Sequence, residues 1–287
     1  MTSSRVPAPM RRAGKGALRR WGVLTASSRP LPDYLLIGTK RGGSTSMAEY
    51  LVRHPGVAPL FPSKAVPKGV RYFDNHYMNG ERWYRSHFTT TGARAGRLAG
   101  EATAHYLFEP RAAERAAATV PEAKIIVLLR EPVARAFSHW REQSRLGGET
   151  LSFEDALKAE PERLKGERDR LLADPAYVSP AHEHRSYRAQ GCYVDLLPAW
   201  MERFAADRML VLFSDEMYAD PASAYARVLS FLGLESHDLA TYAARNKRPL
   251  DAPMHSDTKA QLRDYYRPFD ERLEKVLDRP VPWLHRG

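Results

Sequence analysis

Short apolar runs alternate along the chain with longer segments whose apolar residues recur every three or four positions. Three runs rich in Leu, Ile and Val are typical of buried parallel strands, namely residues 33–39, 124–129 and 209–213. The helical spacing occurs in residues 44–54, 132–146, 193–204 and 223–235. This alternation predicts an α/β fold in which a central parallel β-sheet is flanked by helices. We expect a single domain over residues 31–287.

The weaker patterns add three expectations. Residues 68–75 form a further candidate strand, and an aromatic-rich segment at 80–88 follows as a short helix. Glu101 stands directly after a glycine at an expected strand-to-helix junction. The charge-rich segment 154–190 predicts helices and a loop over the surface. Within it, residues 158–175 predict a solvated helix face, in a place that also suits a lid over the acceptor.

The clearest unit lies at residues 123–148. Five apolar residues from Ile125 to Leu129 form its strand, and Arg130 ends the strand. Pro132 suits the first position of the following helix, and Gly147 closes that helix. Ligands of parallel sheets bind beyond the carboxyl ends of the strands. Arg130, Glu101 and the basic pair 40–41 are all expected at such ends, which indicates a ligand site there.

The turn after the first strand has almost the spacing of a nucleotide-binding P-loop. Gly38, Gly43 and Thr45 fit the pattern G-x-x-x-x-G-K-[ST], but Ser44 stands where the lysine belongs. Backbone amides and a helix N-terminus still favour an anion here. A nucleoside triphosphate with magnesium needs the lysine and a magnesium-binding acid, and no expected strand closes in Asp. The loop therefore predicts a smaller anion without metal, and Arg130 a second, separate phosphate.

The net charge of +10 is concentrated in one segment. Residues 1–30 hold seven Arg or Lys and no acid, whereas the rest holds 37 basic and 34 acidic residues. We expect this basic N-terminal segment to be disordered, either as a solvated leader or as a weak contact with an anionic surface. The nearly neutral remainder argues against nucleic acid as a partner. One cysteine, Cys192, fits a reducing compartment, so the expected location is cytoplasmic.

From about Asp33 to Trp283 the chain resembles the sulfotransferases that use 3′-phosphoadenosine 5′-phosphosulfate (PAPS), particularly the heparan sulfate and carbohydrate branch. Four ordered motifs carry the resemblance: the glycine loop "KRGGST", "EATAHY", "REPVARAFS", and the pattern from Gly191 to Leu234. The resemblance implies a metal-independent enzyme that transfers a sulfuryl group to a hydroxyl, or less readily an amine, of a glycan, lipid or small molecule. Two alternatives stay open: a small-molecule kinase using ATP, and a non-enzymatic anion- or nucleic-acid-binding protein.

The resemblance also implies roles for individual residues. Glu101 is the expected catalytic base, with His105 as its rival and helix capping as the alternative role. Arg41 and Lys68 are expected to stabilise charge in the transition state. The donor is expected to contact Lys40, Arg41, Gly42, Gly43, Ser44, Thr45, Ser46, Arg130, Ser138 and Arg248.

Two positions depart from the family pattern. Arg41 stands where the family more often has lysine, which replaces a mobile point charge by a rigid guanidinium fork. The family's frequent K-E-x-x-[FY]-F reads "KGVRYF", so Lys68 is present but Gly69 replaces the acid.

Overall fold

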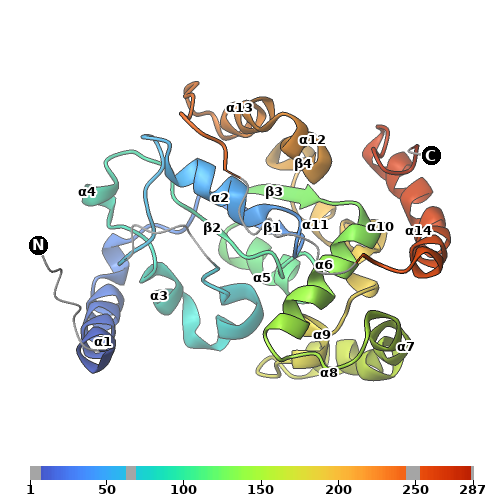
Figure 1. Ribbon diagram of the computed structural model, residues 1–287. Coiled ribbons are helices and arrows are strands. Elements are labelled where there is room, and N and C mark those ends of the chain that lie inside the picture. Colours follow the sequence, from blue (N-terminus) through green and yellow to red (C-terminus); the bar gives the residue numbers. More distant parts are fainter. Residues whose placement is uncertain (1–7, 63–68, 244–252, 286–287) are drawn as a thin grey trace, which may run out of the picture.

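The computed structural model describes residues 8–62, 69–243 and 253–285, with side chains from residue 16 onward. Four strands form one sheet: β1 (Tyr34–Gly38), β2 (Gly100–Ala102), β3 (Lys124–Leu129) and β4 (Met209–Phe213). Their order is β2-β1-β3-β4, and every neighbouring pair is parallel. The predicted α/β class is confirmed (Figure 1).

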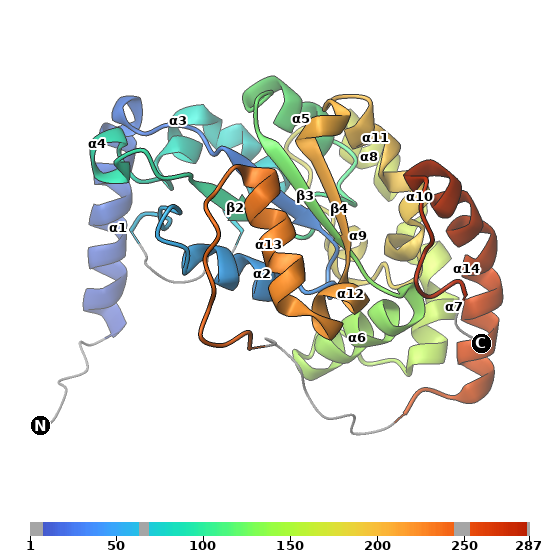
Figure 2. The ribbon, with the colours of Figure 1, turned by 90° about the horizontal axis from the view of Figure 1, so that it is seen from above.

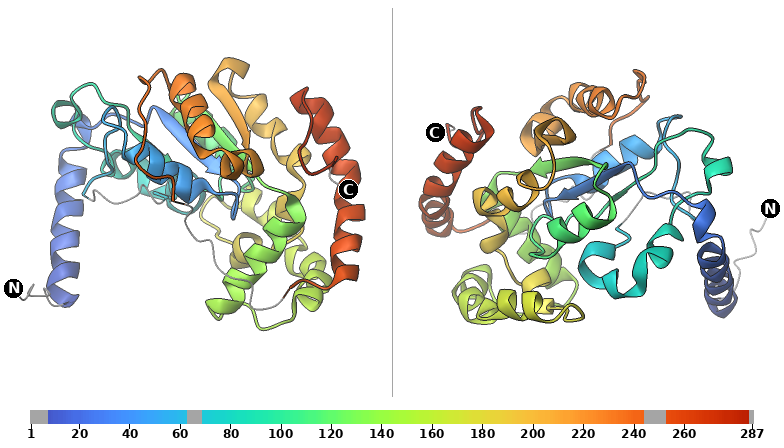
Figure 3. Two further views of the ribbon diagram at one scale, coloured as in Figure 1. Left: turned by 45° about the horizontal axis from the view of Figure 1, so that its top comes forward. Right: turned by 180° about the vertical axis from the view of Figure 1, so that it is seen from behind.

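Helices cover both faces of this sheet. They are α1 (Ala8–Leu24), α2 (Ser44–Val52), α3 (Gly80–Arg85), α4 (Thr91–Arg94), α5 (Ala112–Thr119), α6 (Pro132–Arg145), α7 (Phe153–Leu164), α8 (Glu167–Ala173), α9 (Pro180–His184), α10 (Tyr193–Leu196), α11 (Pro198–Met201), α12 (Ser214–Ala219), α13 (Pro221–Leu232) and α14 (Ser256–Leu277). Figure 2 shows α2, α12 and α13 over one face of the strands. Helices α1 and α14 lie at opposite ends of the molecule in both views of Figure 3. In the described part of the chain, no helix is long and apolar enough to cross a membrane.

Side chains of β3 alternate between two apolar clusters. Ile126 and Leu128 join the cluster under α2 and α13, and Ile125 and Val127 join the cluster on the opposite face. All four are fully buried, so the strand contributes to both cores. This two-sided burial explains why the run carries no polar residue between Ile125 and Leu129.

The expected strand at residues 68–75 is wrong where the structure describes it. Tyr72–His76 form one π-helical turn, preceded by Arg71 at φ 60°. Tyr72 and Phe73 are both buried in the same cluster, and the Tyr72 ring stacks on Tyr84 with 4.3 Å between centroids. A strand would send these consecutive rings to opposite faces, whereas a turn buries both on one side.

Part of the basic N-terminal segment is ordered, contrary to the expectation of disorder. Helix α1 covers Ala8–Leu24, and Arg19 Nη1 donates to the Ser86 carbonyl at 3.1 Å. Arg29 is 2% exposed, donates to the Phe88 carbonyl, and places its guanidinium 4.0 Å from the Phe61 ring centroid. Arg19 and Arg29, which precede the expected start of the domain at residue 31, thus pack on that domain.

Candidate functional site

The glycine loop joins the end of β1 to the start of α2. Gly43 precedes the helix at φ 91°, a conformation in which a side chain is strained. A Cβ on Gly42 would meet the Leu128 carbonyl oxygen at 2.7 Å, so the loop lies directly against β3. Ser44, Thr45 and Ser46 form the first turn of α2. The N-terminal end of α2 therefore points its partial positive charge at the loop.

The structure brings Arg41 together with Arg130 and Ser138, the two residues that were assigned to a separate phosphate. Arg41 Nε donates to Ser138 Oγ at 2.9 Å, and its Nη1 lies 2.8 Å from Glu142 Oε1. Arg130 Nη1 donates to the Arg41 carbonyl at 2.9 Å. Ser138 and Glu142 lie one helical turn apart on α6, so this helix supplies the wall beside the loop. Two guanidinium groups and a hydroxyl thus converge near the start of α2.

Lys40 leads to a second group of charges. Its Nζ donates to the Glu183 carbonyl at 2.7 Å and lies 3.2 Å from Glu183 Oε1. Glu183 Oε2 lies 2.5 Å from Arg71 Nη2, and Arg71 also pairs with Asp74 at 2.8 Å. Burial lowers the pKa of Lys40 to about 8 despite its acidic partner. This group links the loop to α9 and to the turn after residue 69.

Glu183 is ionised in this setting. Burial alone would raise its pKa, but Lys40 and Arg71 outweigh that effect and hold the pKa at about 2. His184 Nε2 lies 3.6 Å from Glu183 Oε1. Burial and then Lys40 lower the pKa of His184, so its imidazole is neutral at pH 7. A carboxylate and a neutral imidazole therefore lie beside the basic residue of the loop.

Glu101 does not lie at this site, which corrects the expectation of a catalytic base. It pairs in register with Leu35, near the start of β1, whereas Lys40 and Arg41 follow the end of that strand. It is fully buried and accepts hydrogen bonds from Tyr84, Tyr106, Thr103 and the Val70 amide, at 2.8–2.9 Å. Both carboxylate oxygens are thus occupied in the core, and Glu101 cross-links β2 to its surroundings.

Three further expectations concern His105, Lys68 and Arg248. The rival base His105 is 4% exposed, and burial followed by Lys40 lowers its pKa well below the usual value. Lys68 and Arg248 lie outside the described residues.

Sequence reasoning missed Glu183, His184 and Arg71. The first two belong to the segment "HEH" at 182–184, inside the charge-rich stretch 154–190 that predicts helices and a loop over the surface. Three consecutive titratable side chains in a helix that begins with proline were the available signal. Arg71 lies two residues after Gly69, and Gly69 occupies the position where the family pattern has an acid.

Comparisons with known proteins agree with the geometry. The sequence model of a family described as "Sulfotransferase domain" matches residues 31–249. A bifunctional heparan sulfate N-deacetylase/N-sulfotransferase 4 of Mus musculus is 27% identical over 285 residues, which are 89% of this chain and 31% of that protein. A heparan sulfate glucosamine 3-O-sulfotransferase 3B1 of Mus musculus is 27% identical over 281 residues, or 90% of this chain and 66% of the relative.

The chain thus spans about a third of the first relative's length and about two thirds of the second's. Among solved structures, a sulfotransferase from Alicyclobacillus acidocaldarius superimposes with a TM-score of 0.68 at 26% identity. That match covers 90% of this chain and all of the other.

Proposed function

Since this chain belongs to the sulfotransferase domain family, we propose that it is a sulfotransferase whose donor is PAPS and whose acceptor is a hydroxyl or amine of a glycan. The observation that carries this proposal is the convergence of Arg41, Arg130 and Ser138 at the glycine loop. Lys40 lies on the same loop and pairs with Glu183. The glycan is supported by the names of the relatives, two of which act on heparan sulfate.

The residues of the loop suit a phosphosulfate. The backbone at Gly42 and Gly43 leaves no room for side chains. The amides at the start of α2, which follow directly, suit an anion. Arg130 and Ser138 are proposed to bind the 3′-phosphate through charge-assisted hydrogen bonds, which Ser138 can make once Arg41 turns to the 5′-phosphosulfate. The donor supplies the sulfuryl group and a nucleotide phosphate as leaving group.

Lys40 and Arg41 are proposed to stabilise charge on the leaving phosphate oxygen. Both lie on the loop between β1 and α2, so their backbone positions are fixed by the sheet. Arg41 is held by Ser138 and Glu142, and Lys40 by Glu183. Preorganised cations at the place where negative charge develops are a large source of rate enhancement.

Glu183 is our proposed acceptor-side base in place of Glu101. The family's acid is missing at Gly69, but Arg71, two residues further on, holds the Glu183 carboxylate at 2.5 Å. The carboxylate is ionised and lies 3.2 Å from Lys40, at the loop rather than in the core. Its pKa of about 2 makes it a weak base, so its proposed role is to take the proton of the acceptor group once sulfuryl transfer makes that proton strongly acidic. His184 is the neighbouring alternative.

The experiment is transfer of labelled sulfate from PAPS, without divalent metal, to two heparosan-type glycans. One carries free amines and the other is fully N-acetylated, so that hydroxyls are its acceptors. We expect label in at least one of them, and Arg41→Ala to lower the rate at least about 100-fold. Arg272→Ala is the matched control, because this arginine is exposed on α14 and pairs with Asp195.

Two results would contradict the proposal. Phosphate transfer from magnesium ATP by wild type, without sulfate transfer, would indicate a kinase. Sulfate transfer to small phenols but to neither glycan would keep the donor and remove the glycan acceptor.

A further inference from the structure

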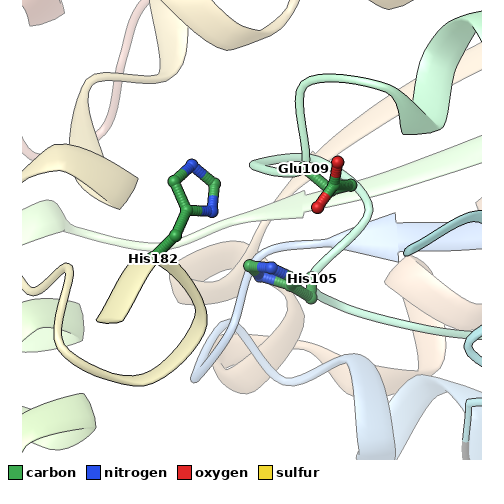
Figure 4. A group of neighbouring side chains, drawn as sticks. All are labelled: His105, Glu109 and His182. Carbon is green, nitrogen blue, oxygen red and sulfur yellow. The ribbon is translucent and has the colours of Figure 1, made fainter. Parts of the chain in front are cut away.

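Three buried side chains next to the site form a group with metal-ligand geometry. His105 and Glu109 belong to one helical turn after β2, where the Glu109 amide donates to the His105 carbonyl at 3.0 Å. His182 belongs to α9. One ligand atom from each lies within 4.8 Å of the other two, and Figure 4 shows the three side chains converging. Their exposures are 4%, 5% and 5%.

Both imidazoles carry a buried nitrogen without a partner. Among the described residues, neither His105 Nδ1 nor His182 Nδ1 has a hydrogen-bond partner. A buried polar atom without a partner costs free energy, and an ion bound at both nitrogens would remove that cost. A metal ion would be bound by such nitrogens in the neutral form of the imidazole.

The carboxylate of Glu109 is held in place from behind. Arg111 Nε donates to Glu109 Oε1 at 2.7 Å, and Arg111 itself donates to the carbonyls of Asp174 and Tyr177 at 2.9 and 3.1 Å. Hydrogen bonds of this kind orient the ligands of metal sites. The His182 ring is also fixed, because it stacks on Phe108 with 4.1 Å between centroids.

The charged side chains around His105, Glu109 and His182 affect how tightly these residues can bind a divalent ion. Lys40 and Arg71 lie near His105, and Arg168 and Arg111 near His182, so four cations oppose a divalent ion. Glu109 offsets part of this repulsion as a ligand, and Glu167 lies near His182. Two imidazoles and one carboxylate suit zinc, which binds three protein ligands and a water with bonds of about 2.0–2.2 Å.

We propose that His105, Glu109 and His182 bind one zinc ion, which links the turn after β2 to α9. The ion would be separate from the sulfuryl-transfer chemistry, with water in its fourth position. Helix α9 also carries Glu183, the partner of Lys40, so the ion would fix the position of that carboxylate at the loop. Bond lengths of about 2 Å require the ligand atoms to close by an ångström or so from their present separations.

The test is metal content and affinity of the full chain, independent of any activity. Wild-type protein is treated with EDTA, dialysed and titrated with zinc against a competing indicator, and bound zinc is measured by elemental analysis. We expect about one equivalent, and a rise in Tm of about 5 °C at a free zinc concentration 100 times the Kd. Cobalt in place of zinc should give visible bands of a tetrahedral site.

Two variants assign the ligands. His182→Phe keeps an aromatic ring on Phe108 and removes the ligand, so zinc affinity should fall more than about 100-fold, beyond the loss usual for an outer-shell partner. His285→Ala, which removes an exposed histidine paired with Glu274 at 2.7 Å, should leave it unchanged.

Two outcomes would overturn the proposal. The first is less than a tenth of an equivalent of zinc in wild type with no change in Tm. The second is unchanged zinc affinity in folded His182→Phe. The wild-type titration decides the matter even if His182→Phe does not fold.

Discussion

Replacing Glu101 tests whether its carboxylate has a structural or a catalytic role. In Glu101→Ala, four donors lose their acceptor: the hydroxyls of Tyr84, Tyr106 and Thr103 and the Val70 amide. An unsatisfied buried donor costs about 1–3 kcal/mol, and hydroxyls can turn toward other acceptors, so we take the low end for each. The total is about 4 kcal/mol of unfolding free energy.

That loss converts into a measurable shift. Unfolding entropy of about 2.1 cal/mol/K per residue gives about 0.6 kcal/mol/K for this chain, so Tm should fall by about 7 °C. Burial raises the pKa of Glu101, so a neutral side chain is tolerated there. Glu101→Gln keeps the shape and one acceptor oxygen, and should stay within about 3 °C of wild type.

The assay is calorimetric unfolding and sulfate transfer on the same preparations. Glu101→Gln should retain turnover within about threefold, because the residue does not reach the loop. A loss of about 10²–10⁴-fold in Glu101→Gln at unchanged Tm, the range of general-base catalysis, would refute this reasoning and return the base to Glu101.

Three further predictions follow from named contacts. Glu183→Gln should lower kcat about 10²–10⁴-fold. The kcat/KM of wild type should stay constant between pH 5 and 7, because the pKa of Glu183 is about 2. A fall in kcat/KM on acidification through pH 6, in protein that remains folded, would favour His184. Deletion of residues 1–30 should lower Tm, because Arg29 is buried against Phe88, and an unchanged melting curve would show that this contact does not matter. Burial raises the pKa of Asp270 to about 7, so its folded form holds a proton that the unfolded chain releases near pH 4. The contribution of Asp270 to stability should therefore fall as pH rises from 4 to 7, against the opposite contribution of the buried histidines, whose pKa values are lowered. In denaturant titrations Asp270→Asn should remove the Asp270 contribution, so that the stability of the variant rises more steeply with pH than that of wild type; an identical slope in the variant would contradict the assignment.

The sequence predicted those helices and strands whose position depends mainly on residues that are neighbours along the chain. The apolar run Ile125–Leu129, the proline at 132 and the glycine at 147 predicted β3 and α6, because burial and termination depend on neighbouring residues. The glycine loop was likewise predicted from spacing. Its contact with Ser138 was reached only through the family motif, since the two residues are 97 positions apart.

Register and long-range pairing were not predictable in the same way. Glu101 was expected at a strand end, but β2 pairs with the beginning of β1, which places Glu101 in the core. Glu183 approaches Lys40 across 143 positions, and no pattern in either segment indicates that contact. Disorder of residues 1–30 was inferred from composition, yet Arg29 contributes a buried cation over an aromatic ring.

The proposed donor site binds the 5′-phosphosulfate and the 3′-phosphate of the donor at separate places. Calorimetry of 3′-phosphoadenosine 5′-phosphate against adenosine 5′-phosphate, without divalent metal, tests it most directly. Loss of the 3′-phosphate should cost about 1.5–3 kcal/mol in wild type, and Arg130→Ala should bind the two nucleotides alike. Equal affinity of wild type for both nucleotides, or binding that appears only with magnesium, would contradict the account.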